Sequence, residues 1–287
     1  MCYDVVAVFD HGDVYPPGYA DQFVLEHGGR IFGALHEMVD AVDCVIIHGC
    51  NWEMHVNRVR PFIESGKAVF VDKPIARNLR DLHQFEQWAQ AGARIAGGSS
   101  LRFCNEARQF LNKPIEQRGT PHTVLCGCAV DDFNYGIHAY TLLAALMGDD
   151  AVNVRHVRRG PQHRVQINWP DGRVGWVVVD EAARRIPFHA VVVTDLGVEH
   201  FVVDNGTLYR ALLEAVLPYL AGDADRPPLS LKQLIVPELW ALAAELSAYE
   251  DDREVSLDEL SEHDVSCNGA AFTRAYRLQR YPNGSSK

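Results

Sequence analysis

Short, fully apolar runs alternate with segments of helical periodicity over the first third of the chain. The apolar runs are residues 5–9, 44–47 and 68–71, and helical spacing of apolar positions marks residues 52–65, 79–91 and a stretch from about residue 20. Apolar strands that alternate with amphipathic helices are typical of βαβ units, in which helices cover both faces of a parallel sheet. The pattern predicts a parallel α/β domain over residues 1–103, with a loop at residues 97–100.

The pattern changes after about residue 103. Helices are expected at residues 105–116, 137–147, 207–220 and 231–249, and strands at 123–130, 164–168, 175–179, 189–194 and 199–203. Strands in close succession with short turns are typical of an antiparallel sheet. Pro237 is expected to start or kink the last helix, because proline lacks the amide hydrogen that a helix interior requires. The sequence therefore predicts a second, α+β domain over residues 104–287, with an open antiparallel sheet.

The charge and composition of the chain argue against several kinds of partner and location. The net charge of -11 disfavours a nucleic-acid partner, which normally meets a basic face. No apolar run approaches the roughly 18 residues of a membrane span, and the N-terminus has neither the basic nor the apolar region of a secretion signal. We therefore expect a soluble cytoplasmic protein with no nucleic-acid or membrane partner.

Cysteine and histidine spacing gives no sign of a metal. The seven cysteines are scattered without a CxxC pair, and the 13 histidines include no HExxH. Cys126 and Cys128 would point to one face of a strand, so a metal or disulfide role remains the alternative to buried, reduced thiols. The sequence predicts no metal cofactor.

Four segments, together with the order of the later sheet and helices, carry a family resemblance over nearly the whole chain. They are Asp43-Cys-Val-Ile-Ile-His-Gly-Cys-Asn-Trp-Glu-Met-His55, Gly66-Lys-Ala-Val-Phe-Val-Asp-Lys-Pro74, Ser100-Leu-Arg-Phe103 and Asn134-Tyr-Gly-Ile-His138. In this order they resemble the glucose–fructose oxidoreductase and inositol dehydrogenase (Gfo/Idh/MocA) family. The resemblance implies an NAD(P)-dependent enzyme acting on a sugar, polyol or related metabolite. It also implies a homodimer or tetramer built through the second-domain sheet.

Lys73 and His138 are the candidate catalytic residues. Hydride transfer from a secondary alcohol needs a base for the hydroxyl proton and a fixed positive group that stabilises the developing alkoxide. Lys73 follows a parallel strand and precedes Pro74, so it should point into the crevice at the carboxyl ends of the strands. His138 has the near-neutral intrinsic pKa of a general base. The alternatives are a solvated surface lysine and a structural histidine.

Further site residues are expected around this pair. The cofactor candidates are Asp10 for the ribose, then His48, Asn51, Trp52, His55 and Asp72, and the substrate candidates are Arg102, Tyr135 and Thr141. Trp52 could instead pack at a helix start, and Arg102 could form a salt bridge between the domains.

The chain departs from the family pattern in two ways. Asn134, a candidate helper of His138, and Thr141 stand where similar proteins carry acidic residues. No GxGxxG occurs anywhere, and the chain begins at what resembles the second strand of a dinucleotide fold. Loss of the first strand would leave a gap between buried neighbours. Either the first domain is shortened by truncation, or the fold is remodelled and the cofactor lost.

Two other functions therefore stay open. One is a cofactor-independent lyase, isomerase or hydrolase that uses Lys73 and His138 for proton transfer. The other is a non-catalytic subunit or regulator.

Overall fold

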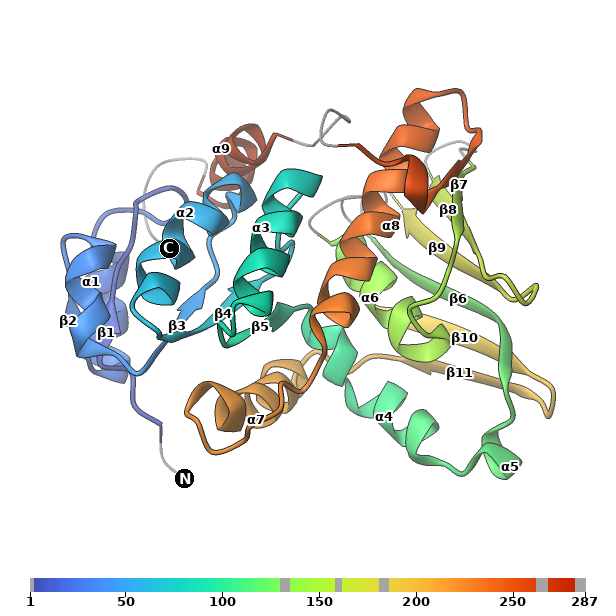
Figure 1. Cartoon of the computed structure of the whole chain (residues 1–287), viewed down its shortest axis with the longest axis horizontal. Helices are drawn as coiled ribbons and strands as arrows, with labels where there is room; N and C mark the ends of the chain where they lie inside the picture. Colours follow the sequence, from blue (N-terminus) through green and yellow to red (C-terminus); the bar gives the residue numbers. More distant parts are fainter. Residues whose placement is uncertain (1–2, 130–134, 158–161, 181–185, 262–267, 282–287) are drawn as a thin grey trace.

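The computed structural model describes residues 3–129, 135–157, 162–180, 186–261 and 268–281. It contains two groups of strands, a parallel group formed by the first hundred residues and a larger mixed sheet formed by later ones (Figure 1). Helix α8 (Leu231–Tyr249) lies between them and contributes buried side chains to the cores of both. The mixed α/β architecture expected from the sequence is confirmed.

The parallel strands of the first domain are divided between two sheets. The strands are β1 (Ala7–Val8), β2 (Arg30–Ile31), β3 (Cys44–Ile47), β4 (Ala68–Asp72) and β5 (Ile95–Gly98). The pairs β1–β2, β3–β4 and β4–β5 are parallel. Among the described residues, no strand pairs with the second edge of β1 or of β3. The helical segments of this part are α1 (Tyr19–His27), η1 (Leu35–Ala41), η2 (Trp52–Met54), α2 (His55–Glu64) and α3 (Leu79–Gln90).

Gly97 and Gly98 belong to β5, although their composition predicts a loop. A side chain at position 97 would place its Cβ only 2.4 Å from the backbone oxygen of Val71. Glycine is therefore required for β5 to lie against β4, and the requirement is invisible without knowing which strands are neighbours.

We expect Gly97→Ala to lower the free energy of unfolding by about 1–3 kcal/mol, because the neighbouring atom is backbone and cannot turn away. Urea denaturation measures the difference. Gly197→Ala is the matched control, since no atom lies within 4 Å of its Cβ position. Equal stabilities for the two variants would contradict the close approach of β4 and β5.

The second domain is built on one large sheet. Its strands are β6 (Pro121–Ala129), β7 (Asn153–His156), β8 (Gln162–Asn168), β9 (Val174–Asp180), β10 (His189–Thr194), β11 (Val198–Val202) and β12 (Glu254–Ser256). In the described residues the order is β11-β10-β6-β9-β8-β7-β12. Every pair is antiparallel except β6–β9, which makes the sheet mixed and departs from the purely antiparallel expectation.

Helices connect and cover these strands. They are η3 (Ser100–Phe103), α4 (Asn105–Asn112), α5 (Ile115–Arg118), α6 (Gly136–Met147), α7 (Leu208–Leu220), η4 (Leu257–Glu259) and α9 (Gly269–Arg280). The single helix expected at residues 105–116 is divided into α4 and α5 because Pro114 cannot continue it. Helix α8, in contrast, continues through Pro237, with Trp240 and Ala243 fully buried beyond it.

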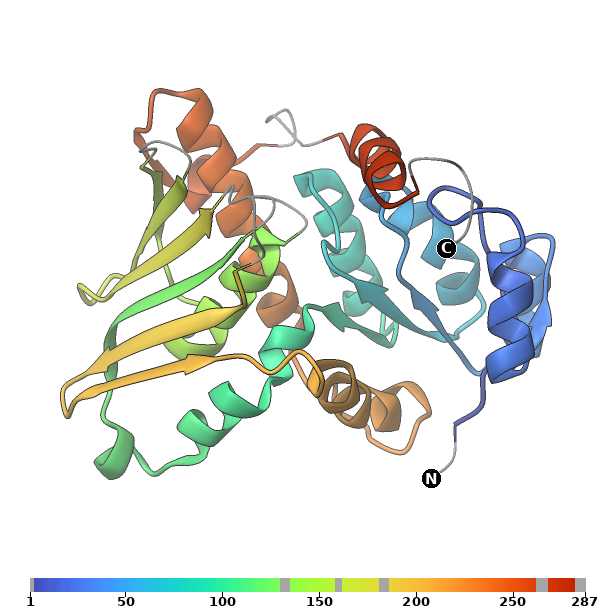
Figure 2. The same ribbon diagram turned by 180° about the vertical axis from the view of Figure 1, so that it is seen from behind.

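Three C-terminal helices return to the first domain. Helix α7 packs Leu212 and Val216 against Phe70 of β4. Helix α9, red in Figure 2, contacts η2, and the ring centre of Phe272 lies 5.2 Å from that of Trp52. Helix α9 therefore lies after the carboxyl end of β3, whereas α7 packs against β4 and lies near Arg94, just before β5.

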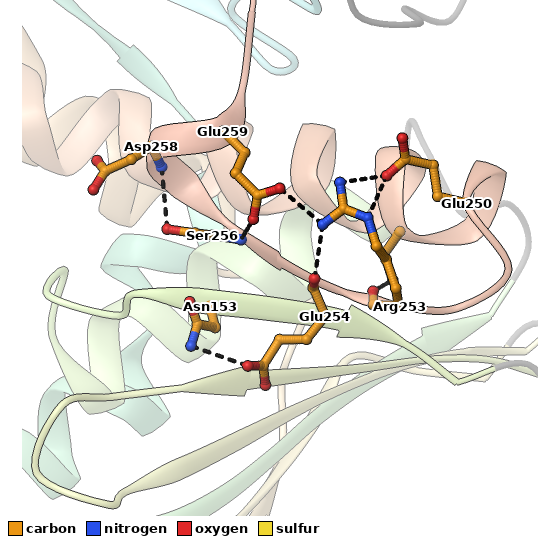
Figure 3. Close-up of polar contacts among 8 residues, drawn as sticks. Asn153, Glu250, Arg253, Glu254, Ser256, Asp258 and Glu259 are labelled. Atoms are coloured by element: carbon orange, nitrogen blue, oxygen red, sulfur yellow. Dashed lines mark hydrogen bonds and ion pairs between the residues drawn. The ribbon is translucent and has the colours of Figure 1, made fainter.

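A surface network fixes the turn from α8 into β12. Arg253 bonds the carboxylates of Glu250 and Glu259, and Glu254 accepts from Asn153 of β7 (Figure 3). Ser256 and Glu259 form a capping box at η4. Because these side chains are exposed, the ion pairs add little to stability and mainly hold β12 in register with β7.

Candidate functional site

The structure brings together Lys73, which follows a strand of the parallel group, and Tyr135 and His138, which lie at the start of helix α6. Lys73 follows β4, and its Nζ lies 5.5 Å from the ring centre of Tyr135. The Tyr135 ring is 6.2 Å from the His138 ring at the start of α6. Phe188 packs against both, at 6.5 Å from Tyr135 and 4.9 Å from His138. A cation, a phenol and an imidazole thus share one site at the carboxyl end of a parallel strand, where open α/β sheets bind ligands.

Ser99 orients the ring of His138. Its Oγ lies 2.6 Å from His138 Nδ1, and it also accepts a hydrogen bond from the backbone N–H of Leu101. Both partners are buried. The hydroxyl is neutral, so it fixes the ring without adding a charge beside it. Sequence reasoning missed Ser99, which is 39 positions from His138 and carries no motif of its own.

Glu238 supports the segment that follows Lys73. Its Oε1 accepts the backbone N–H of Ile75 at 2.8 Å, from a side chain on α8 that is only 2% exposed. Burial raises the pKa of Glu238 to about 7, although the Ile75 N–H and the charges of Arg77 and Lys73 oppose the rise. A carboxyl group that titrates near neutrality therefore lies beneath the loop that carries the candidate catalytic lysine.

His55 joins the loops after β3 and β4. Its Nε2 lies 2.9 Å from the carbonyl oxygen of Gly49, and its Nδ1 lies 3.1 Å from that of Ile75. Burial lowers the pKa of His55, and the two backbone hydrogen bonds oppose the effect. A neutral ring donates to only one of these carbonyls at a time. His55 therefore acts as a brace between two loops of the site and is fully buried.

A hollow opens at the carboxyl ends of β1 and β3. About 650 Å³ of space lies within it, counting the solvent at its open mouth. The lining residues are Phe9, Asp10, His11, Asp13, Val14, Tyr15, Leu35, Ile46, Ile47, His48, Gly49, Cys50 and Arg58. Two of the cofactor candidates, Asp10 and His48, therefore lie here. Asp10 Oδ1 accepts the N–H of Gly12, which fixes the carboxylate at the wall.

The other cofactor candidates lie outside the lining. Trp52 is 1% exposed and packs against Phe272, as in the alternative of helix-start packing. Asn51 lies beside Gly269, where an added Cβ would be 2.7 Å from its Oδ1. Asp72 is the half-buried last residue of β4, directly before Lys73.

The substrate candidates separate into two groups. Tyr135 contacts Lys73 and His138, as described above. Arg102 instead forms a salt bridge with Asp149, with both side chains mostly buried, and Thr141 donates to the carbonyl of Ile137 within α6. Asn134, the expected helper of His138, lies outside the described residues.

Two features are absent from the described part of the chain, a metal-binding cluster and a membrane-spanning helix. It contains no group of three or more His, Cys, Asp or Glu side chains placed to hold a metal ion. Its helices are all too short or too polar to traverse a lipid bilayer.

Parallel strands with a hollow at their carboxyl ends, followed by a helix-backed mixed sheet, form an α/β architecture with a Rossmann-like first part. Residues 2–96 match the model of the Gfo/Idh/MocA oxidoreductase family, described as an NAD-binding Rossmann fold. The match covers the first two of the four motifs and agrees with the family resemblance that they carry.

Solved structures agree over most of the chain. GenD2 from gentamicin A biosynthesis, in complex with NAD, is 18% identical with a TM-score of 0.73 and 88% coverage of both chains. A probable dehydrogenase from Thermotoga maritima is 16% identical, with a TM-score of 0.75 and coverage of 91% of this chain and 94% of its own. A myo-inositol dehydrogenase from Lactobacillus casei, in complex with NAD(H) and myo-inositol, is 16% identical, with a TM-score of 0.72 and 88% coverage of both chains. At these identities the likeness establishes the fold. No curated protein matches the chain.

Proposed function

We propose that this chain is an NAD(P)-dependent oxidoreductase that transfers a hydride between the cofactor and a secondary alcohol of a sugar, polyol or related small metabolite. The observation that carries the proposal is the grouping of Lys73, Tyr135 and His138 after a parallel strand. The myo-inositol dehydrogenase with a similar fold supports a hydroxylated substrate.

The residues present fit a nicotinamide dinucleotide. Asp10 follows β1, which resembles the second strand of a dinucleotide fold. An acidic side chain after that second strand binds a ribose hydroxyl in such folds. The hollow leads from Asp10 to Gly49 and Cys50 after β3, and the charge of Lys73 acts on the Cys50 thiol. When bound there, the nicotinamide would accept or supply the hydride.

The protein's own residues would handle the proton and the developing charge. His138 takes the hydroxyl proton of the substrate, with its ring held by Ser99. Lys73 stabilises the negative charge that develops on the substrate oxygen, and a pre-positioned cation does so more strongly than water. Tyr135 and Phe188 shield one side of this site from solvent.

A turnover assay tests the proposal. The purified chain would be incubated with NAD+ or NADP+ and a panel that includes myo-inositol, scyllo-inositol and simple sugars, and nicotinamide reduction followed by absorbance. Substrate-dependent reduction supports the proposal. If the cofactor stays oxidised with every compound while the chain remains folded, the dehydrogenase function is wrong for this chain.

The absence of GxGxxG from the sequence favours one second candidate. Without that turn, Lys73 and His138 could catalyse a redox-neutral proton transfer, as in a lyase, isomerase or hydrolase. Conversion of a substrate without any nicotinamide would distinguish this candidate.

The large sheet is our proposed assembly surface. Helices α6 and α8 lie on its side facing the first domain (Figure 1). Val198 and Val202 of its edge strand β11 are mostly exposed. We propose a homodimer or tetramer through this sheet, which light scattering would measure.

We expect Ser99→Ala to lower kcat by roughly 10- to 100-fold with little change in KM, because His138 loses the partner that sets its orientation. The pH dependence of kcat should also change on the limb governed by His138. Loss of the bond to Leu101 costs about 1 kcal/mol of stability in any case. Ser100→Ala is the control, since Ser100 is a buried neighbour in the same turn. An unchanged kcat and pH profile in Ser99→Ala would show a purely structural serine.

A further inference from the structure

Arg58 is a buried cation at the wall of the hollow. It lies on α2, its side chain is 9% exposed, and its Nη2 pairs with Asp13. A Cβ at position 49 would lie 2.2 Å from Arg58 Nη1, so the glycine lets the guanidinium reach the loop after β3. Nε has no hydrogen-bond partner among the described residues. The helix thus delivers a donor-rich group to the carboxyl edge of the sheet.

Asp13 pairs with Nη2 of the Arg58 guanidinium and leaves its Nε without a hydrogen-bond partner among the described residues. The two groups meet at the hollow, but Asp13 is 30% exposed and belongs to the segment between β1 and α1. An arginine fork matches carboxylate and phosphate oxygens with the same planar geometry. Asp13 is therefore positioned where an anionic ligand group would bind Arg58.

Positive charge also reaches the segment around Asp13 from α9. Arg277 donates to the carbonyl of Gly12 at 2.6 Å. Arg280 lies close enough to Tyr15 and Cys50, two lining residues, to act on them electrostatically. The acidic side chains that face the hollow are Asp10 and Asp13. An anion in the hollow would therefore lie beside Arg58 and within the electrostatic reach of Arg280, with Asp10 as a second acidic lining residue.

A dinucleotide brings two phosphate charges into its site, and a fixed guanidinium beside them would stabilise them. A glycine-rich turn at a helix N-terminus normally holds the pyrophosphate, and no GxGxxG occurs in this sequence. We propose that Arg58 binds the pyrophosphate of a dinucleotide in this hollow, and that Asp13 pairs with the guanidinium when the ligand is absent. The inference rests on the proposed function and adds how this chain holds the phosphates.

The proposal predicts opposite effects for the two partners of the ion pair. Titration calorimetry with ADP-ribose at low ionic strength should show at least 10-fold weaker binding to Arg58→Gln. Asp13→Asn should bind several-fold more tightly, because the competing carboxylate is gone. Arg60→Gln is the matched control, since Arg60 lies on the same helix in an exposed pair with Glu64 and should bind like the wild type.

Adenosine is the probe without phosphates, and Arg58→Gln should leave its binding unchanged. Inorganic pyrophosphate should bind more weakly than ADP-ribose, because it lacks the ribose that Asp10 would contact. If it binds as tightly, the hollow takes free phosphate compounds and the dinucleotide proposal is overturned. Equal losses of ADP-ribose affinity in Arg58→Gln and Asp13→Asn would overturn it too, because they would show that the ion pair only stabilises the local structure. A gain in Asp13→Asn cannot result from misfolding, so this variant decides the matter even if Arg58→Gln fails to fold.

ADP-ribose has no nicotinamide, so this experiment is independent of turnover. No binding of ADP-ribose by the wild type would overturn the inference, whatever the turnover assay gives. Binding that follows the predicted pattern, without any nicotinamide reduction, would support pyrophosphate binding by Arg58. It would contradict only the proposed hydride transfer.

Discussion

Replacing Lys73 with methionine should lower kcat for nicotinamide-dependent oxidation of the substrate by about 10²–10³, the usual effect of removing one group that stabilises a developing oxyanion. Methionine keeps much of the length and apolar surface of lysine but removes the charge. The loss should fall on kcat more than on KM, because the alkoxide charge exists only as the reaction proceeds. Steady-state kinetics on the purified variant measures the effect.

Lys67→Met provides the matched control. Lys67 directly precedes β4 and Lys73 follows it, so the two lysines lie at opposite ends of one strand. Both variants change the net charge equally. A similar loss of kcat in both would point to a general charge effect, and full activity of Lys73→Met would remove Lys73 from the mechanism.

Glu238→Gln should abolish a stability change of about 2 to 3 kcal/mol between pH 5 and pH 8. The pKa of Glu238 in the folded protein is about 7, against an ordinary value of 4.5. The folded state binds this proton more tightly than the unfolded state, so the contribution is full below about pH 4.5 and is lost as the pH rises through 7. Glutamine keeps an oxygen that accepts the Ile75 N–H and does not titrate.

Urea denaturation at both pH values gives the effect as a difference between wild type and variant, which cancels the titration of other groups. The variant should gain stability relative to the wild type as the pH rises. Glu214→Gln is the control, because Glu214 is exposed and pairs with exposed Arg210. Parallel pH profiles for wild type and Glu238→Gln would contradict a neutral carboxyl group beneath Lys73.

The sequence predicts the strands and helices whose pattern is local. Cys44–Ile47 is a strand with the expected bounds, because a short, β-branched apolar run that ends at a glycine turn is typical of a buried strand. The same holds for Leu231–Tyr249 as a helix. Strands β2 and β12 escaped prediction, because Arg30–Ile31 and Glu254–Ser256 are too short for a pattern and form only by pairing with distant strands. Helix α9 escaped as well, since its mean apolar character is low and its packing partner Trp52 is over 200 residues away.

The site divides in the same way. Lys73 and His138 stand in recognisable motifs, and the structure places them 5.5 and 6.2 Å from the ring centre of Tyr135. Their supports, Ser99 and Glu238, are defined by contacts between distant segments, so no spacing in the sequence indicates them. One local signal did exist for Arg58, an arginine among the buried positions Val59 and Phe62 of an amphipathic helix. A buried arginine requires a partner, and that requirement indicates a site.

The most direct test of the account is a titration of the folded 287-residue chain with NADH and NADPH, followed by nicotinamide fluorescence. The account predicts saturable binding of at least one of them in the micromolar range. Absence of binding by a chain whose circular dichroism and cooperative unfolding show it to be folded would contradict the dehydrogenase function and leave redox-neutral chemistry at Lys73 and His138.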